Sequence, residues 1–229
     1  MGAILVALLL AYVPTPGSLL KRAASRTFTL GRTREVALSG TITVKDQGAH
    51  PAQLTLRFPL SCKLDADGVS LAVRGNVAKP SGVTEGTTGP ALQLLQLACP
   101  FLTYRGLPAA DAEEALRAAA QGAGADLTSG GGLSRIGDRV AYVLGAGAHD
   151  LTRPQLWIYK DTHAPARVVA QGGADVRFLE YGNPAAADWF PRVIELWEAG
   201  QLTARFEALE ARGARGAGAG AEEEDDSGQ

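Results

Sequence analysis

The chain has 229 residues, of which 46% are hydrophobic and 20% are charged, and its formal net charge is −2. This composition suits a globular core and excludes a wholly disordered chain. Five acidic residues are consecutive at 222–226, and without them 22 basic residues face 19 acidic ones. No basic stripe with interleaved aromatic residues accompanies this mild excess, so we expect no nucleic-acid partner.

The N-terminus carries an uncharged apolar run, GAILVALLLAY, at residues 2–12. A membrane-spanning helix needs about 20 residues, whereas a run of this length is typical of a signal peptide. No Lys or Arg precedes the run and no A-x-A motif follows it, so a hydrophobic first strand or helix is the alternative. With cleavage after Gly17, residues 1–17 are predicted to be a signal peptide, and we expect a periplasmic location.

The first part of the predicted domain is rich in strands. An amphipathic helix is expected over residues 16–26, with a proline in its first turn. Apolar and polar residues then alternate with a period of two at 36–44, 54–60 and 69–73, and turn residues occupy 65–68. Consecutive alternating segments joined by turns predict an antiparallel meander.

The pattern changes to helices in the middle of the chain. Thr88 is a candidate N-cap, and the segment ALQLLQLACPFL at 91–102 has apolar residues on so many sides that it needs burial against more than one neighbour. Pro100 is expected to end or kink this helix. A second helix is predicted over 108–121, followed by a loop rich in Gly, Ala and Ser at 122–132.

Strands resume after that loop, with turn signals between them. The six segments are 139–144, 154–160, 166–171, 175–181, 189–197 and 201–209. About nine strands with two helices inserted among them predict an α+β fold, in which the helices cover one face of a curved antiparallel sheet. We place one domain at 18–210 and a disordered, acidic, Gly/Ala-rich tail at 211–229.

The two cysteines, Cys62 and Cys99, leave two interpretations open. A disulfide between them would close a loop of about 37 residues and add roughly 3–4 kcal/mol to stability. Alternatively, they are separate buried thiols that act as small hydrophobic side chains.

Sequence motifs for catalysis are missing. The three histidines, at 50, 149 and 163, fall in predicted turns or loops and form no H-x-x-x-H or H-E-x-x-H pattern for a metal. No G-x-S-x-G motif occurs. Carboxylates at turns and strand ends have no spacing typical of an acid–base pair: Asp161, Asp175, Glu180 and Asp188. We therefore expect no catalytic residue, no metal and no cofactor, and a protein that is not an enzyme.

The hairpin PQLWIYKDTHAPARVVAQ at 154–171 resembles the strand–turn–strand of LolA-like lipoprotein-sorting proteins. GDRVAYVLGA at 137–146 and FPRVIELWEAGQLTARFEAL at 190–209 are similar to later strands of that family, and GTITV at 40–44 fits an early one. The resemblance implies an unclosed half-barrel whose helical lid covers an apolar concavity. In that family acyl chains pass from an inner-membrane donor to an outer-membrane acceptor, while other relatives carry different lipids or sense envelope stress.

The resemblance implies a carrier, expected to be a monomer, with an acylated lipoprotein or another lipid as its cargo. Its lid would use Leu92, Leu95, Leu97 and Phe101. The sheet wall would use Leu54, Leu56, Phe58, Tyr142, Leu144, Leu156, Ile158 and Phe178. The alternatives are a structural or stress-sensing envelope module, in which these residues are ordinary core, and a hydrolase with an unrecognised site. An apolar cavity of several hundred cubic ångströms favours the carrier, and a packed interior favours the module.

Overall fold

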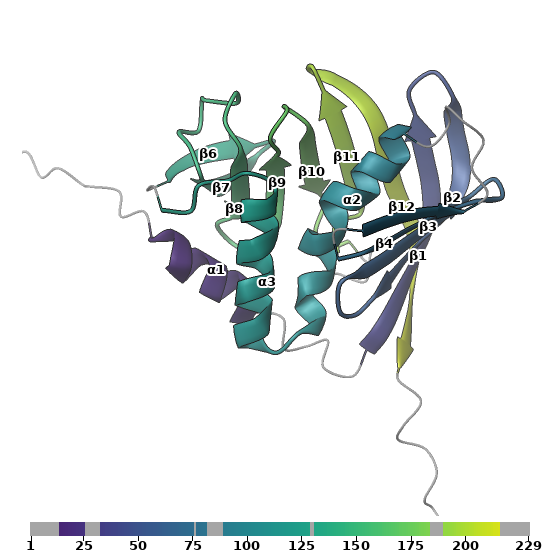
Figure 1. Ribbon diagram of the computed structural model, residues 1–229, viewed down its shortest axis with the longest axis horizontal. Coiled ribbons are helices and arrows are strands. Elements are labelled where there is room, and N and C mark those ends of the chain that lie inside the picture. Colours follow the sequence, from purple (N-terminus) through teal and green to yellow (C-terminus); the bar gives the residue numbers. More distant parts are fainter. Residues whose placement is uncertain are drawn as a thin grey trace, which may run out of the picture.

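The strands in the described part of the chain form one antiparallel sheet of twelve strands, which curves around the helices in Figure 1. The computed structural model describes residues 14–25, 33–75, 77–81, 89–128, 131–183 and 190–215. The strands in these residues are β1 (Thr33–Val44), β2 (Gly48–Arg57), β3 (Ser61–Ala66), β4 (Val69–Arg74), β5 (Val77–Ser81), β6 (Gly132–Ile136), β7 (Arg139–Leu144), β8 (Gln155–Tyr159), β9 (Pro165–Val169), β10 (Asp175–Leu179), β11 (Val193–Glu198) and β12 (Gln201–Arg215).

The sheet is built from two meanders that meet in its middle. The strand order is β5-β4-β3-β2-β1-β12-β11-β10-β9-β8-β7-β6, so the first and last strands of the chain are neighbours. Ile42 of β1 lies opposite Phe206 of β12, and Leu38 of β1 lies opposite Leu54 of β2. The end strands β5 and β6 have no pairing with each other, so the sheet is an unclosed half-barrel and the predicted α+β class is confirmed.

Three strands, β3, β5 and β6, were not predicted from the sequence pattern. β3 was hidden because β2 ends at Arg57 and the turn at Phe58, Pro59 and Leu60 keeps the apolar alternation running across it. β5 and β6 are short end strands, and β6 begins at the end of the predicted Gly-rich loop. As end strands of the described sheet, β5 and β6 each pair with one neighbour only, and β6 has no fully buried position, so it needs no clear apolar alternation.

The helices are α1 (Pro16–Ser25), α2 (Gly89–Thr103), the 3-10 turn η2 (Tyr104–Gly106) and α3 (Ala109–Gly122). In Figure 1, α2 and α3 lie side by side within the curve of the sheet, and α1 lies against α3. The predicted helices are present, but α2 does not end before Pro100. It continues to Thr103, whose hydroxyl donates a hydrogen bond to the Cys99 carbonyl at 2.8 Å. Burial of Cys99 and Phe101 on either side of the proline offsets the lost backbone bond.

The ends of the described chain bear on the predicted boundaries. The candidate cleavage position after Gly17 falls in the first turn of α1, whose Leu19 and Leu20 are fully buried. β12 runs to Arg215 and so includes the first five residues of the predicted tail, 211–215, which are ordered in this strand. Residues 1–13 and 216–229 lie outside the described residues. No helix in the described part is long and apolar enough to cross a membrane.

Two apolar clusters lie on opposite faces of the sheet. The larger one fills the concave side, where the alternating apolar residues of the strands meet α1, α2 and α3. The smaller one lies on the outer face of the β6 end and consists of Ala141, Val143, Trp157, Tyr159, Ala164 and Ala166. Burial on both faces explains why β8 is buried at every position.

Candidate functional site

Helix α2 lies across the concave face of the sheet and contacts strands from both meanders. Its buried residues occupy more than one side of the helix: Ala91, Leu94, Leu95, Ala98, Cys99, Phe101, Leu102 and Thr103. The breadth of this apolar surface, predicted from the sequence, is satisfied by the sheet beneath it and by α3 beside it. α2 is therefore the element that covers the concave face of the half-barrel.

A small apolar space remains between α2 and the sheet, with a volume of about 10 Å³. Its lining comes from α2 and from four strands and comprises Leu54, Leu64, Ala91, Leu94, Leu95, Ala98, Leu102, Ile194 and Phe206. A volume of this size corresponds to about one water molecule, and a lining without polar groups keeps such a space dry. The interior beneath α2 is thus packed, which is the arrangement expected of the module rather than of a preformed cavity.

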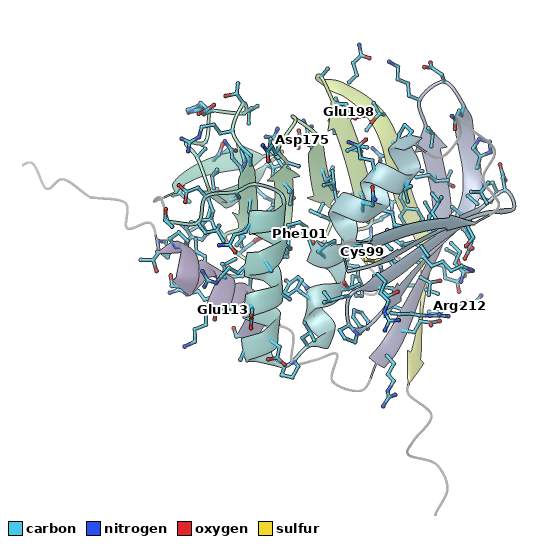
Figure 2. All side chains as sticks on the ribbon, in the orientation of Figure 1. Cys99, Phe101, Glu113, Asp175, Glu198 and Arg212 are labelled. Atoms are coloured by element: carbon cyan, nitrogen blue, oxygen red, sulfur yellow. A yellow bond between two sulfur atoms is a disulfide. The ribbon has the colours of Figure 1, made fainter. Side chains whose placement is uncertain are left out.

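The four candidate lid residues lie at different depths. Leu95 and Phe101 are buried at the interface with the sheet, and the ring of Phe101 lies 6.2 Å from that of Phe178 on β10. Leu92 and Leu97 are partly buried at the border of the core. Figure 2 labels Phe101 and Cys99 on α2, next to the sheet.

The candidate wall residues all belong to the concave core or its border. Seven are buried: Leu54, Leu56, Tyr142, Leu144, Leu156, Ile158 and Phe178. The eighth, Phe58, lies in the turn after β2, where it is partly buried and stacks on Phe190 at 6.2 Å between ring centroids. Of the eight, Leu54 alone is in the lining of the small space. Leu64, Ile194 and Phe206 also line it and were not singled out from the sequence, although they follow the period-two alternation of β3, β11 and β12.

A disulfide joins Cys62 on β3 to Cys99 on α2, with 5.8 Å between the Cα atoms. Both cysteines are 1% exposed. This bond connects the covering helix to the sheet at one point along its length.

The outer face of the sheet carries a cross-strand series of arginines stacked on aromatic rings. Arg139 lies over Tyr159, Arg167 over Trp157 and Arg177 over Trp197, at 3.9, 4.9 and 4.3 Å from the ring centroids. Burial raises the pKa of Tyr159 to about 12 despite the opposing charge of Arg139. Single strands give no signal of this series, because each pair joins residues that are neighbours only in the folded sheet.

The carboxylates considered for hydrolysis are held by arginines on this outer side. Asp161 pairs with Arg139, Asp175 with Arg167, and Glu180 with Arg192, while Asp188 lies outside the described residues. Burial acts to raise the pKa of Asp161, but the hydrogen bonds from Arg139 and from the Thr162 backbone outweigh it and lower the pKa. Each of these three carboxylates is therefore held in an ion pair with an arginine.

Histidines and metal ligands give no further site in the part of the chain that the structure describes. His50 lies on β2 rather than in a turn, and its Nδ1 pairs with Asp67. No group of three or more His, Cys, Asp or Glu residues within the described ranges is arranged to hold a metal ion.

Comparison with known proteins gives structural similarities alone. No protein-family model matches the chain, and no curated protein matches it. The chain is similar to a LolA superfamily protein from Nitrosomonas europaea, with 14% identity, a TM-score of 0.42, and 87% of this chain and 93% of that chain covered. This is the family that the 154–171 hairpin resembles.

Two further solved structures are similar over most of the chain. A DUF1329 family protein from Desulfovibrio piger has 10% identity and a TM-score of 0.49, with 89% of this chain and 95% of that chain covered. The MucA/MucB complex from Pseudomonas aeruginosa has 16% identity and a TM-score of 0.32, with 86% and 56% covered.

Proposed function

We propose that this protein is a carrier of the cell envelope that shields the acyl chains of a lipoprotein or another lipid beneath α2. The observation that carries the proposal is an unclosed sheet whose concave face is apolar and is covered by a helix that is itself apolar on several sides. Such a helix can give up its contacts with the sheet to a ligand of similar chemistry. The described conformation is then the closed, empty form.

On this proposal, the closed, empty form and the open, ligand-bound form have similar free energies. Burying each CH₂ group contributes about 0.8 kcal/mol, so one acyl chain of about 14 carbons gives on the order of 10 kcal/mol before costs. In the closed form Leu94, Leu95 and Leu102 of α2 supply burial of the same kind. Exchange of one set of apolar contacts for another keeps open and closed forms close in free energy, which release of a cargo requires.

A non-catalytic envelope module with a packed core is the second candidate. It is favoured by the volume of about 10 Å³ beneath α2, which holds no acyl chain unless the helix moves. The two candidates differ in one property, which is whether α2 leaves the sheet when an apolar ligand is present.

The cellular setting belongs to the same proposal. The apolar run at 2–12 supports export to the periplasm, and the disulfide between Cys62 and Cys99 suits an oxidising compartment. A carrier there would take its cargo from an inner-membrane donor and deliver it toward an outer-membrane acceptor.

Binding of a fluorescent fatty acid, together with native mass spectrometry of protein purified from its own periplasm, tests the proposal. We expect Leu95→Glu to abolish binding while the sheet stays folded by circular dichroism, because it places a carboxylate in the apolar space. Gln96→Glu is the matched control, since it adds the same charge on the exposed side of α2. If the wild-type protein binds no probe and carries no lipid, the carrier proposal is wrong and the envelope module with a packed core is favoured.

A further inference from the structure

Helix α2 contains a weak point directly beside its covalent attachment. Pro100 lies inside the helix and follows Cys99, the residue bonded to Cys62 on β3. A proline has no backbone N–H, so the helical hydrogen bond to the carbonyl four residues earlier, at Gln96, is not made. The attachment and the missing bond thus lie within one turn of each other.

The two sides of this point differ in how they are held. On the C-terminal side, Phe101 packs on Phe178 and the Thr103 hydroxyl bonds the Cys99 carbonyl. Thr103 and Tyr104 are fully buried, and η2 packs against both α2 and α3. These contacts fix the last turn of α2 to the sheet and to α3.

On the N-terminal side, residues 89–98 cover the small apolar space. Four side chains of this segment line it: Ala91, Leu94, Leu95 and Ala98. Two of them are alanines, which fill little volume, and all four side chains are apolar, so they form neither hydrogen bonds nor ion pairs with the sheet. Apolar contact is non-directional, so these residues can separate from the sheet without leaving a broken polar network.

We propose that α2 opens as a hinged flap, in which residues 89–98 pivot about the Cys99–Pro100 junction while the last turn of α2, η2 and α3 stay in place. This inference rests on the proposed function, since it states how the ligand enters. The disulfide sets the pivot by holding Cys99 against β3. The helix bends there because Pro100 has no N–H to donate to the Gln96 carbonyl.

The hinge also decides which part of the sheet meets the ligand. An acyl chain admitted beneath residues 89–98 lies first on Leu54, Leu64, Ile194 and Phe206, which line the space there. The wall residues Tyr142, Leu144, Leu156 and Ile158, on β7 and β8, are outside that lining. Binding therefore starts at the centre of the sheet, where β2, β3, β11 and β12 pass under α2.

Hydrogen exchange of the ligand-free protein, measured by mass spectrometry, tests the pivot directly. We expect the amides of residues 93–98, which follow the first helical turn with its unbonded N–H groups, to exchange about tenfold or more faster than those of 101–103, because only the first segment opens. Pro100→Ala restores the missing N–H and should bring the two rates closer together. Pro108→Ala, a proline-to-alanine change just before α3, is the matched control and should leave both rates unchanged.

The rate of binding a fluorescent fatty acid gives a second readout. We expect stopped-flow association to slow about tenfold in Pro100→Ala and to be unchanged in Pro108→Ala. Equal exchange rates in the two segments of the wild-type protein, or no effect of Pro100→Ala on their ratio, overturn the hinge. A wild-type protein that shows the exchange difference but binds no probe supports the hinge and overturns the proposed carrier function.

Discussion

Arg167 and Asp175 form a two-point ion pair across adjacent strands of the outer face. The guanidinium Nε and Nη2 atoms donate to the two carboxylate oxygens, both at 2.7 Å, and each side chain is 11% exposed. Arg177 donates to the same carboxylate from within β10. One carboxylate thus bridges two arginines that also stack on Trp157 and Trp197.

Asp175→Ala is expected to lower the free energy of unfolding by about 3 kcal/mol, because it leaves two largely buried guanidinium groups without their shared partner. Urea denaturation followed by fluorescence measures the change. Glu210→Ala removes the carboxylate of an exposed pair with Arg212 and should change stability by less than about 0.5 kcal/mol. Equal losses of stability in the two variants would show that Asp175 contributes no more than the carboxylate of an exposed ion pair.

Loss of the Cys62–Cys99 disulfide is expected to cost about 4 kcal/mol, since the bond closes a loop of 37 residues in the unfolded chain. Urea unfolding with and without a reductant measures the difference. The double variant Cys62→Ala and Cys99→Ala provides the same comparison where the buried bond resists reduction. Coinciding unfolding curves for the bonded and the unbonded protein would contradict this prediction.

The Tyr159 hydroxyl makes stability depend on alkaline pH. Its pKa is raised from 10.0 to about 12 by burial, and it donates a hydrogen bond to the Phe178 carbonyl at 3.0 Å. The folded state therefore keeps this proton at a pH where the unfolded chain loses it. The contribution is complete below pH 10 and is lost as the pH rises toward 12.

We expect Tyr159→Phe to flatten the fall in stability between about pH 10 and pH 12, while costing about 1 kcal/mol at neutral pH through the lost hydrogen bond. Urea midpoints across this range check both effects. Burial also raises the pKa of Tyr181, which remains in the variant, so part of the slope persists. An unchanged slope in Tyr159→Phe would show that Tyr159 does not titrate as described.

Gly106 is required by its close approach to Phe58. A Cβ at Gly106 would lie 2.2 Å from the Phe58 Cβ, so Gly106→Ala must displace the Phe58 ring from its stack on Phe190. We expect a loss of about 1–3 kcal/mol in thermal or urea unfolding. Gly122→Ala, at the end of α3 with open space around it, should be neutral or slightly stabilising. A neutral Gly106→Ala would mean that η2 and the Phe58 turn can separate.

Much of the fold could be predicted from periodicity. The alternation at Val36, Leu38 and Ile42 placed these residues on one face, and all three are buried on the concave side. The broad apolar surface of residues 91–102 predicted a helix covered on more than one side, which α2 is. These features are local, because a strand or helix repeats its inward positions at a fixed interval.

The residues around α2 could be assigned to faces but not to a cavity. Leu95 and Leu54 were expected at the lid and the wall, and both line the small space that the structure shows. Ile194 and Phe206 were missed, since nothing in the sequence of β11 or β12 indicates that β12 pairs with β1 in the middle of the sheet. Their position beneath α2 depends on the pairing of β12 with β1, in which Phe206 lies opposite Ile42, more than a hundred positions away in the sequence.

The resemblance of the 154–171 hairpin and the alternation of the strands indicated from the sequence alone a curved sheet with an apolar helix over it. Only the tertiary structure decided that this helix packs against the sheet and leaves an unfilled volume of about 10 Å³, and that a disulfide joins Cys99 to Cys62 on β3. The physical reason is that period determines which side chains share a face, whereas the volume left between two faces depends on how far the chain brings them together.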